Sequence, residues 1–453
     1  MNFLFPSSLT WADQIQSRLL KLAAIFLVIN AAVLTLSPAV RYHSWEVQYR
    51  WQHWLGVMIW LASFSLVHRL MIQTLPERDP YLLPLAAILT GWGLLSIWRL
   101  SAENGLRQSL WLAFSLLILI LGLKAQNPLG VLRRYKYIWL TSGILISALT
   151  FVFGTYPGGE GPRLWLGCCG LYFQPSEPLK LLLIIYLAAY LSDKMPASPN
   201  FIQLLLPTFL LVGAALGILL IQRDLGTASL LLILYFTVIF LAIGQFEVLA
   251  AGGISLLTAG IIGYLVFDVI RIRIDAWLNP WLDPSGRSYQ IVQSLIAISS
   301  GQILGRGAGI GSPGFVPIAH SDFIFSSIGE EYGLAGAIGI LIILAIWISR
   351  GFRIAIRAAN RYQRFLAAGA AAYIAVQSIF IIGGNIRLLP LTGVTLPFVS
   401  YGGSSLLTSF LALLILTLIS ARRETDPAPI PNSRPFLVTS GLLLASLAAA
   451  GLV

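Results

Sequence analysis

Residues 305–331 read GRGAGIGSPGFVPIAHSDFIFSSIGEE, and they separate long apolar runs on either side. Glycine recurs at every second or third position of the first half, and two prolines follow, so this half cannot be a continuous helix. The second half brings together His320, Asp322, Glu330 and Glu331. A carboxylate in an apolar setting is costly unless it is paired or used. This stretch is therefore the first candidate for a functional site.

The composition predicts an all-α polytopic integral membrane protein. Of 453 residues, 57% are hydrophobic and only 10% are charged, whereas soluble domains carry about 25% charged residues. About thirteen apolar runs are long enough to cross a bilayer. They are 20–38, 54–71, 81–98, 109–124, 137–154, 177–192, 202–221, 225–244, 247–267, 332–349, 365–384, 403–420 and 435–452. Because a second run follows the first, we expect an uncleaved anchor and no signal peptide.

The charges predict how the chain is oriented. Lys and Arg gather in the connections 124–136, 350–364 and 421–434, and such loops face the cytoplasm. If the thirteen runs alternate, the amino terminus is cytoplasmic, and the connections 155–176, 268–331 and 385–402 face outside. The net charge of +11 is then an orientation signal and a contact with anionic lipid heads. It does not indicate nucleic-acid binding, because no basic soluble domain is present.

A first polar segment of the outer side reads RLWLGCCGLYFQPSEPLK, residues 163–180. We expect Ser176 to cap a helix and Glu177 to lie in its first turn, against the helix dipole. Glu177 and Lys180 are three residues apart, so they share a face and can pair. Two interpretations remain open, a capped helix with a local ion pair or a charged pair that lines a substrate path. The two adjacent cysteines exclude a disulfide framework and a zinc site.

Two further outer segments are the turn QRDLG at 222–226 and the stretch NIRLLPLTGVTLPFVSYGGSS at 385–405. Asp224 is expected to be a simple helix N-cap. Prolines and glycines prevent a continuous helix over 385–405, and such backbone at membrane depth is tolerated only beside protein or a wet cavity. We expect these segments, 163–180 and the long loop to line one cavity open to the outer face.

Within the long loop, the residue after Asp322 begins the apolar run Phe-Ile-Phe. Apolar surroundings raise the pKa of a carboxyl and suit it to proton abstraction. His320 taken alone is also compatible with a structural histidine. Glu330 and Glu331 are expected to open the next span, as partners of its N-terminal dipole. Residues 289–300 place apolar residues on one helical face, which predicts a helix on the membrane surface without chemistry.

Several stretches resemble signatures of the SEDS family, the RodA, FtsW and SpoVE proteins of bacterial cell-wall synthesis. They are FQPSEPLK (173–180), DLGT (224–227), YQIVQS (289–294), HSDFIF (320–325) with GEE (329–331), and LPFVSYGGSS (396–405). Their order and spacing agree with the family over roughly residues 80–420. Several motifs in register are far more specific than one short pattern. The extra amino-terminal hairpin makes the chain resemble RodA more than FtsW.

The resemblance implies a ten-span glycosyltransferase core at 76–424, with the large outer loop 268–331. An extra transmembrane hairpin at 1–75 would precede the core, and an extra transmembrane helix at 425–453 would follow it. It further implies a peptidoglycan glycosyltransferase of the bacterial cytoplasmic membrane that polymerises lipid II for cell shape, elongation or division. Undecaprenyl pyrophosphate would be released. The implied partner is a class B penicillin-binding protein, a transpeptidase, within the elongation or division machinery.

Asp322 matches the position of the family's essential acid and is the predicted catalytic residue. The predicted substrate-binding residues are Arg163, Trp165, Glu177, Lys180, His320, Arg273 and Ser400. Cations must balance the leaving pyrophosphate, and the candidates are Arg163, Lys180 and either Arg271 or Arg273. No metal ligand is predicted, and a divalent cation (Mg or Mn) at the pyrophosphate is left open.

The chain departs from the family pattern at three places and leaves two rival functions open. Arg223 replaces a proline in the short turn, Ile318 replaces an acid two positions before His320, and Pro178 replaces a bulky apolar residue. No Walker A or HExxH motif is present. One rival is a lipid II flippase or transporter, which predicts transfer of lipid II without glycan growth. The other is a scaffold that only activates a partner transpeptidase, for which Asp322 would be dispensable.

Overall fold

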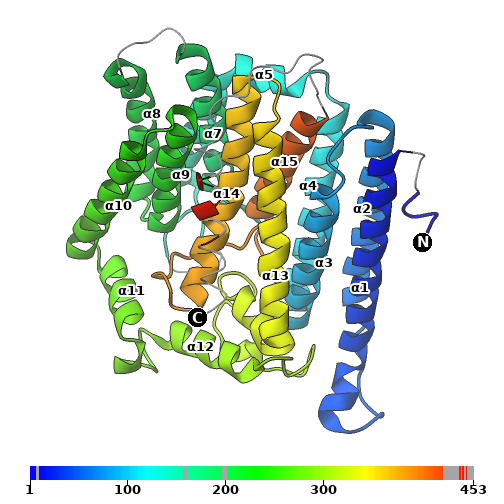
Figure 1. Ribbon diagram of the computed structural model, residues 1–453. Helices are drawn as coiled ribbons and strands as arrows, with labels where there is room; N and C mark the ends of the chain where they lie inside the picture. The colour runs from blue at the N-terminus through cyan, green and yellow to red at the C-terminus, as the bar shows by residue number, and fades with distance from the viewer. Residues whose placement is uncertain are drawn as a thin grey trace.

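The computed structural model is a bundle of long helices (Figure 1), as expected for an all-α polytopic membrane protein. It describes residues 1–6, 10–156, 161–168, 170–195 and 201–421, together with 438–439, 441–442 and 445. The helices are α1 (Trp11–Tyr42), α2 (His53–Thr74), α3 (Leu82–Leu100), α4 (Ala102–Lys124), α5 (Pro128–Arg134), α6 (Lys136–Phe153), α7 (Ser176–Lys194), α8 (Phe201–Ile221), α9 (Leu225–Ile243), α10 (Phe246–Val266), α11 (Asp268–Leu278), α12 (Tyr289–Gly301), α13 (Ile324–Ile356), α14 (Arg361–Asn385) and α15 (Gly403–Ser420). Strands β1 (Leu166–Cys168) and β2 (Leu171–Phe173) form a small hairpin, and η1 (Pro280–Leu282) and η2 (Pro313–Phe315) are short 3₁₀ turns.

Eleven helices of the described residues are long and apolar enough to cross a membrane. They coincide with eleven of the predicted runs. Helix α7 occupies the run 177–192, but it is not among the eleven, because it carries charged residues at both ends. The run 435–452 lies almost entirely outside the described residues. The predicted helix at 289–300 is confirmed as α12.

Burial separates the central helices from those at the periphery. The apolar windows of α3, α14 and α15 are 83%, 89% and 83% buried, whereas those of α6 and α10 are 22% and 11% buried. Small residues at 367–372, AAGAAA, let α14 pack closely against its neighbours. The central helices therefore support the site, and α6 and α10 turn most of their surface toward lipid.

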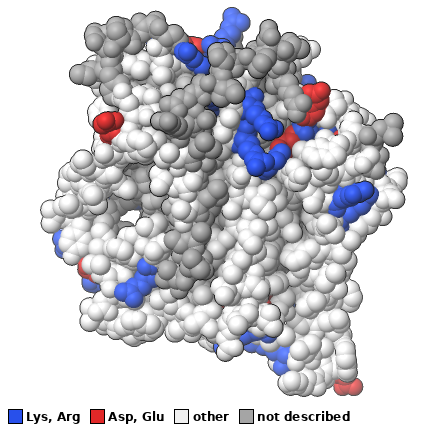
Figure 2. Space-filling model, in the orientation of Figure 1, with Lys and Arg blue, Asp and Glu red and all other residues white. Residues whose placement is uncertain are grey.

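The bundle has two distinct ends. Helix α5 lies at one end, and α11 and α12 lie at the other (Figure 1). On the face drawn in Figure 2, charged side chains lie mainly toward the two ends, and most of the surface between them is uncharged. This distribution suits a chain that crosses a bilayer, because charge is costly at membrane depth.

The amino-terminal hairpin α1–α2 is docked on the rest of the bundle. The Phe26 ring lies 5.2 Å from the Trp92 ring of α3. Tyr332 of α13 donates a hydrogen bond to Asn30 Oδ1 at 2.9 Å. Trp60 Nε1 donates to the carbonyl of Ala87 at 3.0 Å. These contacts join both helices of the hairpin to the helices that follow.

Helix α13 starts earlier than its apolar run predicted. It begins at Ile324 and is divided at Gly333, so Glu330 and Glu331 lie at the end of the first helical segment, directly before the segment that carries the apolar run, and their role as partners of its N-terminal dipole stays a prediction. Gly333 interrupts the helix with φ 64° and ψ −163°, a conformation that glycine adopts without a steric penalty. The next two amides, of residues 334 and 335, donate to the carbonyls of residues 302 and 303 at 2.8 and 3.1 Å. The break therefore fastens the end of α12 to α13.

Candidate active site

Asp322 lies at the end of the connection between α12 and α13, two residues before α13 begins. Its carboxylate is partly buried, and Ser321 Oγ donates to Oδ1 at 2.9 Å. The following residues Phe323 and Ile324 are fully buried. Burial raises the pKa of Asp322 above its usual range, while the Ser321 hydrogen bond and the charge of Arg273 act in the opposite direction. The predicted rise in pKa is thus confirmed in direction.

Arg273 reaches the same place from α11. Its Nη1 donates to the carbonyl of Thr392 at 3.1 Å. A Cβ on Gly393 would lie 3.5 Å from Arg273 Nη2 and 3.6 Å from Asp322 Oδ2. Burial lowers the pKa of Arg273, and the charges of Asp322 and Asp224 raise it. The Asp322 carboxylate and the Arg273 guanidinium therefore share the space above Gly393. Neither group takes part in an ion pair within 4.0 Å among the described residues.

The stretch 396–401 holds the backbone that carries Asp322. Ser400 Oγ donates to the carbonyl of Ser321 at 2.7 Å and accepts from the amide of Leu396 at 2.9 Å. The Tyr401 amide donates to the carbonyl of His320 at 2.8 Å. Ser400 is buried, and both bonds of its hydroxyl go to backbone. Its observed contacts are therefore those of a supporting residue, and its predicted contact with substrate stays a prediction.

His320 is partly buried beside the ring of Tyr401, with ring centroids 5.3 Å apart. Burial lowers the pKa of His320 and favours the neutral imidazole. A neutral histidine two residues before Asp322 can donate or accept a hydrogen bond, but it adds no positive charge for a pyrophosphate.

Asp224 joins the first two polar segments. It is the N-cap of α9, as predicted, and accepts from the amide of Thr227 at 3.2 Å. Its Oδ2 also accepts from Gln174 Nε2 at 3.2 Å and from Ser176 Oγ at 2.9 Å. The prediction that Ser176 caps α7 is wrong, because Pro175 occupies the cap position and the Ser176 hydroxyl is turned to Asp224 instead. A single carboxylate thus fastens the start of α7 to the start of α9.

The predicted pair of Glu177 and Lys180 is confirmed at 2.9 Å, and the Lys180 side chain is fully buried. Lys180 Nζ also donates to Gln377 Oε1 at 3.1 Å. Gln377 Nε2 in turn donates to the carbonyl of Thr395 at 2.8 Å, two residues beyond Gly393. In the described part of the chain, Glu177 Oε2 is a buried acceptor without a hydrogen-bond partner. This pair therefore supports the same stretch that borders Asp322, at a second position.

Arg163 and Trp165 lie in the hairpin region, apart from these contacts. Arg163 is exposed, and the Trp165 ring packs 5.6 Å from the ring of Tyr156. The Trp165 carbonyl accepts from the amide of Thr155 at 2.8 Å. The structure thus brings together Asp322, Arg273, His320 and Ser400, links Glu177 and Lys180 to them through residues 392–396, and leaves Arg163 and Trp165 at the outer rim.

Two amides of α14 were missed by the sequence analysis. Gln377 is described above, and the side chain of Asn385 donates to the carbonyl of Asp322 at 2.7 Å. Each is a lone amide in an otherwise apolar run, and polar residues inside membrane helices usually mark function. That signal was present in the sequence.

The protein side chains do not form a resident metal site at this place. Over the residues that the structure describes, no three His, Cys, Asp or Glu side chains come together in a group that could hold a metal ion. Magnesium and calcium are held by sets of oxygen ligands, usually with more than one carboxylate or with substrate phosphates. Asp322 alone does not provide such a set.

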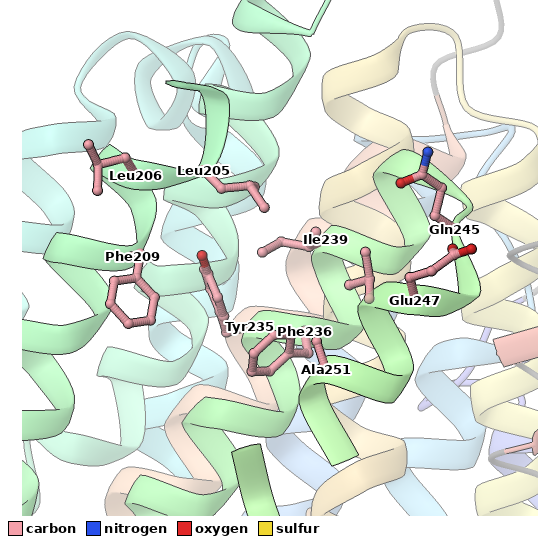
Figure 3. Close-up of a pocket in the computed structure, with 10 residues that line it drawn as sticks. Leu205, Leu206, Phe209, Tyr235, Phe236, Ile239, Gln245, Glu247 and Ala251 are labelled. Atoms are coloured by element: carbon pink, nitrogen blue, oxygen red, sulfur yellow. The ribbon is translucent and has the colours of Figure 1, made fainter. Parts of the chain in front are cut away.

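A cavity of about 510 Å³ lies elsewhere, between α8, α9 and α10 (Figure 3). Apolar side chains such as Phe209, Phe236 and Ile239 line it, with Gln245 and Glu247 at the α9–α10 connection. Asp224 is at the opposite end of α9. None of the predicted site residues lines this cavity, so it is separate from the site at Asp322.

Comparison with known proteins identifies the family. A family model for FtsW, RodA and SpoVE, described as "Cell cycle protein", matches residues 82–425. The chain belongs to this family. It is 34% identical over 438 residues to the "Peptidoglycan glycosyltransferase RodA" of Mycobacterium tuberculosis, which covers 90% of this chain and 92% of the relative. It is 37% identical over 294 residues to "Stage V sporulation protein E" of Bacillus subtilis, which covers 64% of this chain and 79% of that protein.

Solved structures agree with this assignment. A crystal structure of the Thermus thermophilus rod shape determining protein RodA matches with a TM-score of 0.57 and 26% identity, over 77% of this chain and 98% of that one. A chain from a structure on the coordination of polymerization and crosslinking by a peptidoglycan synthase complex matches with a TM-score of 0.65 and 28% identity. That match covers 77% of this chain and 99% of the other.

Proposed function

We propose that this family member is a peptidoglycan glycosyltransferase that polymerises lipid II into glycan strands, with Asp322 as the general base. One observation carries the assignment of the base. The Asp322 carboxylate has one side-chain hydrogen-bond donor, a raised pKa and a neighbouring cation with which it is not closely paired. A buried carboxylate that only stabilised the fold would be expected to be closely paired with a cation, as Glu177, Glu330 and Glu331 are. The names of the mycobacterial relatives support the activity.

In the proposed reaction, the Asp322 carboxylate takes the proton of the 4-hydroxyl of the acceptor sugar. The acceptor oxygen forms a bond to the anomeric carbon of the donor glycan. The bond from that carbon to the pyrophosphate oxygen breaks, and the electron pair leaves with undecaprenyl pyrophosphate. A single displacement of this kind inverts the anomeric centre. A positioned base contributes about 10²–10⁴-fold to the rate.

The surroundings of the three candidate cations differ, and they support different roles in balancing the leaving group. Arg273 lies beside Asp322 and keeps Nη2 free of the backbone bond that Nη1 makes. Lys180 is buried and already paired with Glu177. Arg163 is exposed at the outer rim. We therefore assign Arg273 to the pyrophosphate at the reacting centre and Arg163 to the approach of the substrate, with Lys180 in a supporting role.

We further propose that the protein lies in the bacterial cytoplasmic membrane with its amino terminus in the cytoplasm. Helix α5 with its two arginines would then be cytoplasmic, and the opposite end with Asp322 would face outside. In this proposal residues 76–424 are the catalytic core, 1–75 an additional hairpin and 425–453 an additional span. The partner would be a class B penicillin-binding protein, consistent with the peptidoglycan synthase complex among the similar structures.

The test is polymerisation of purified lipid II by the full-length protein, with glycan products separated on a gel. Asp322→Asn keeps the shape of the side chain and removes the base, so we expect product formation to fall by about 10²–10⁴-fold. The Tm in detergent should stay at or slightly above that of the wild type, because an isolated, partly buried charge is removed.

Ser299→Ala is the matched control, since this serine bonds only within its own helix and is exposed. It should polymerise like the wild type. Wild-type product from Asp322→Asn would contradict the assignment of the base. Transfer of lipid II across vesicles without any glycan growth by the wild type would contradict the proposed activity itself.

A further inference from the structure

Asn385, the last residue of α14, has a side chain that is fully hydrogen-bonded inside the protein. Its Nδ2 donates to the carbonyl of Asp322 at 2.7 Å and to that of Ile381 at 2.9 Å. Its Oδ1 accepts from Ser326 Oγ at 2.8 Å and from the Ser326 amide at 3.3 Å. Asn385 has no exposed surface. The amide thus uses both donors and its acceptor at once.

The network includes a third helix. Ser294 of α12 donates to the carbonyl of Asn385 at 2.8 Å, and its hydroxyl lies 2.5 Å from that of Ser326. Both serines are fully buried. Helices α12, α13 and α14 therefore meet at Asn385, and the amide of Asn385 connects this point to the backbone of Asp322.

One hydrogen bond of the Asn385 side chain leaves its own helix and goes to the backbone of Asp322. An amide buried at the end of a membrane helix must be satisfied, and the Ile381 carbonyl of its own helix already accepts one proton from Asn385. The other proton goes to Asp322, 63 residues away in the sequence. Asp322 lies one residue before the N-cap Phe323, so its carbonyl stands outside the hydrogen bonds of α13. The bond from Asn385 therefore fixes the peptide after Asp322, as the bond from Ser400 fixes the peptide before it.

We infer that Asn385, assisted by Ser326 and Ser294, is a positioning residue for Asp322. This inference rests on the proposed function, in which Asp322 is the base. Productive geometry has to be kept within about 0.5 Å, and a displacement of about 1 Å can cost about 10²-fold in rate. Asn385 touches neither substrate nor reacting atoms and acts only through the backbone of the acid.

The experiment compares Asn385→Leu and Ser326→Ala with the matched variant Ser327→Ala. Ser327 is the next residue of the same turn, is also buried, and bonds only to the carbonyl of Phe323. In Asn385→Leu we expect the kcat for lipid II polymerisation to fall by about 10²-fold. The KM should change by less than about threefold, because a positioning residue acts on the base and not on substrate binding. The kcat of Ser326→Ala should fall about fivefold, which corresponds to the free energy of about one neutral hydrogen bond. The kcat of Ser327→Ala should stay within about twofold of that of the wild type, because this serine lies outside the network.

The pH profile separates positioning from a general loss of stability. The groups around Asp322 that carry charge or titrate are Arg273 of α11, Asp224 beyond it, and His320 of the loop. None is changed by Asn385→Leu. Once released, the Asp322 carboxylate meets more water, so its pKa falls toward the usual value and the acid limb of kcat moves to lower pH. A variant that is merely less stable keeps the acid limb of the wild type.

Wild-type kcat and an unshifted acid limb in both Asn385→Leu and Ser326→Ala overturn the inference, provided that Asp322→Asn is inactive. If Asn385→Leu does not give a monodisperse protein, Ser326→Ala against Ser327→Ala decides alone. An equal loss in both serine variants also overturns it, because the loss then does not follow the network. An active Asp322→Asn contradicts the proposed function instead, so the two failures are distinguishable.

Discussion

Acids at two places of one stretch, Asp322 and the pair Glu330–Glu331, have opposite surroundings. Asp322 has one hydroxyl donor and a cation that is not closely paired with it. Glu330 accepts from the amide of Ser312 at 2.7 Å. Glu331 lies 3.3 Å from Arg99 Nε. Both glutamates are buried and each has an arginine within 4.0 Å, Arg306 for Glu330 and Arg99 for Glu331, whereas Asp322 has no ion pair within that distance.

The two regions differ because the glutamate pair fastens the loop to α13, whereas Asp322 is the proposed base. Arg99 Nη2 also donates to the carbonyls of Gly309 and Gly311 at 3.1 and 3.0 Å. The amides of Arg306 and Gly307 donate to the carbonyls of Glu330 and Glu331 at 3.0 and 2.9 Å. Glu330 and Glu331 thus fasten the glycine-rich part of the loop to α13. The same carboxylate chemistry supports the architecture at one place and is available for reaction eight residues earlier, and the close ion pair with an arginine makes the difference.

The variant Glu331→Gln is expected to give the largest effect that separates the two regions, and this effect is a loss of stability. The substitution keeps the shape and leaves the mostly buried Arg99 without its ionised partner. Breaking such a pair costs about 3–5 kcal/mol, so the Tm in detergent should fall by several degrees while remaining activity per folded molecule is kept. Glu103→Gln is the matched control, since Glu103 pairs with Arg107 on the surface and such pairs contribute about 0.3–0.5 kcal/mol. An equal Tm for both variants would remove the structural half of the comparison.

Gly393→Ala should affect the reacting region with little effect on the rest. Gly393 has φ +71°, and its new methyl group would lie next to both Arg273 and Asp322. The left-handed conformation alone costs a residue with a Cβ about 1–2 kcal/mol, and the methyl group occupies part of the space that Asp322 and Arg273 share. We expect at least about tenfold lower kcat/KM for lipid II. Gly314→Ala, in the connection between α12 and α13, is the control, because nothing lies within 4 Å of its added Cβ. Equal kinetics in the two variants would show that the space above Gly393 is not used.

The sequence predicted the helices well and the site in part, for physical reasons that particular residues illustrate. Apolar runs and the N-cap at Asp224 are local signals, and both were confirmed. The apolar residues after Asp322 correctly predicted its raised pKa. The helical segment that begins at Ile324 was missed because the apolar run starts only at residue 332. The break at Gly333 was missed because a glycine in a sequence does not say which conformation it adopts. The approach of Arg273 to Asp322 depends on where α11 lies, which no local pattern encodes.

Arg273→Gln is expected to move the pH dependence of the reaction. The positive charge of Arg273 stabilises ionised Asp322 and so lowers the pKa of Asp322. Without that charge, the pKa rises further above its usual range, and the base becomes ionised only at higher pH. The acid limb of kcat should therefore shift upward by about one pH unit. Arg271→Gln is the control, because Arg271 is exposed and lies 3.8 Å from Asp268. A downward shift, or the same profile for both variants, would contradict the proposed electrostatics.

The smallest effect is expected from Tyr332→Phe, which tests how the amino-terminal hairpin supports the architectural region. Tyr332 of α13 follows Glu331 directly and donates to Asn30 of α1, so the hydroxyl joins the hairpin to α13 at the place where the glycine-rich part of the loop is fastened. Its removal keeps the ring contact with Trp92 and costs about 1 kcal/mol. The local readout is tryptic cleavage after Arg306, whose side chain is half exposed within the loop. Cleavage should become several-fold faster, as expected for a loss of about 1 kcal/mol in closing the loop. Tyr264→Phe loses an exposed hydrogen bond to Asp275 and should leave cleavage unchanged. If Tyr332→Phe also leaves it unchanged, the hairpin does not stabilise this loop, and the architectural region depends on Arg99 and the two glutamates.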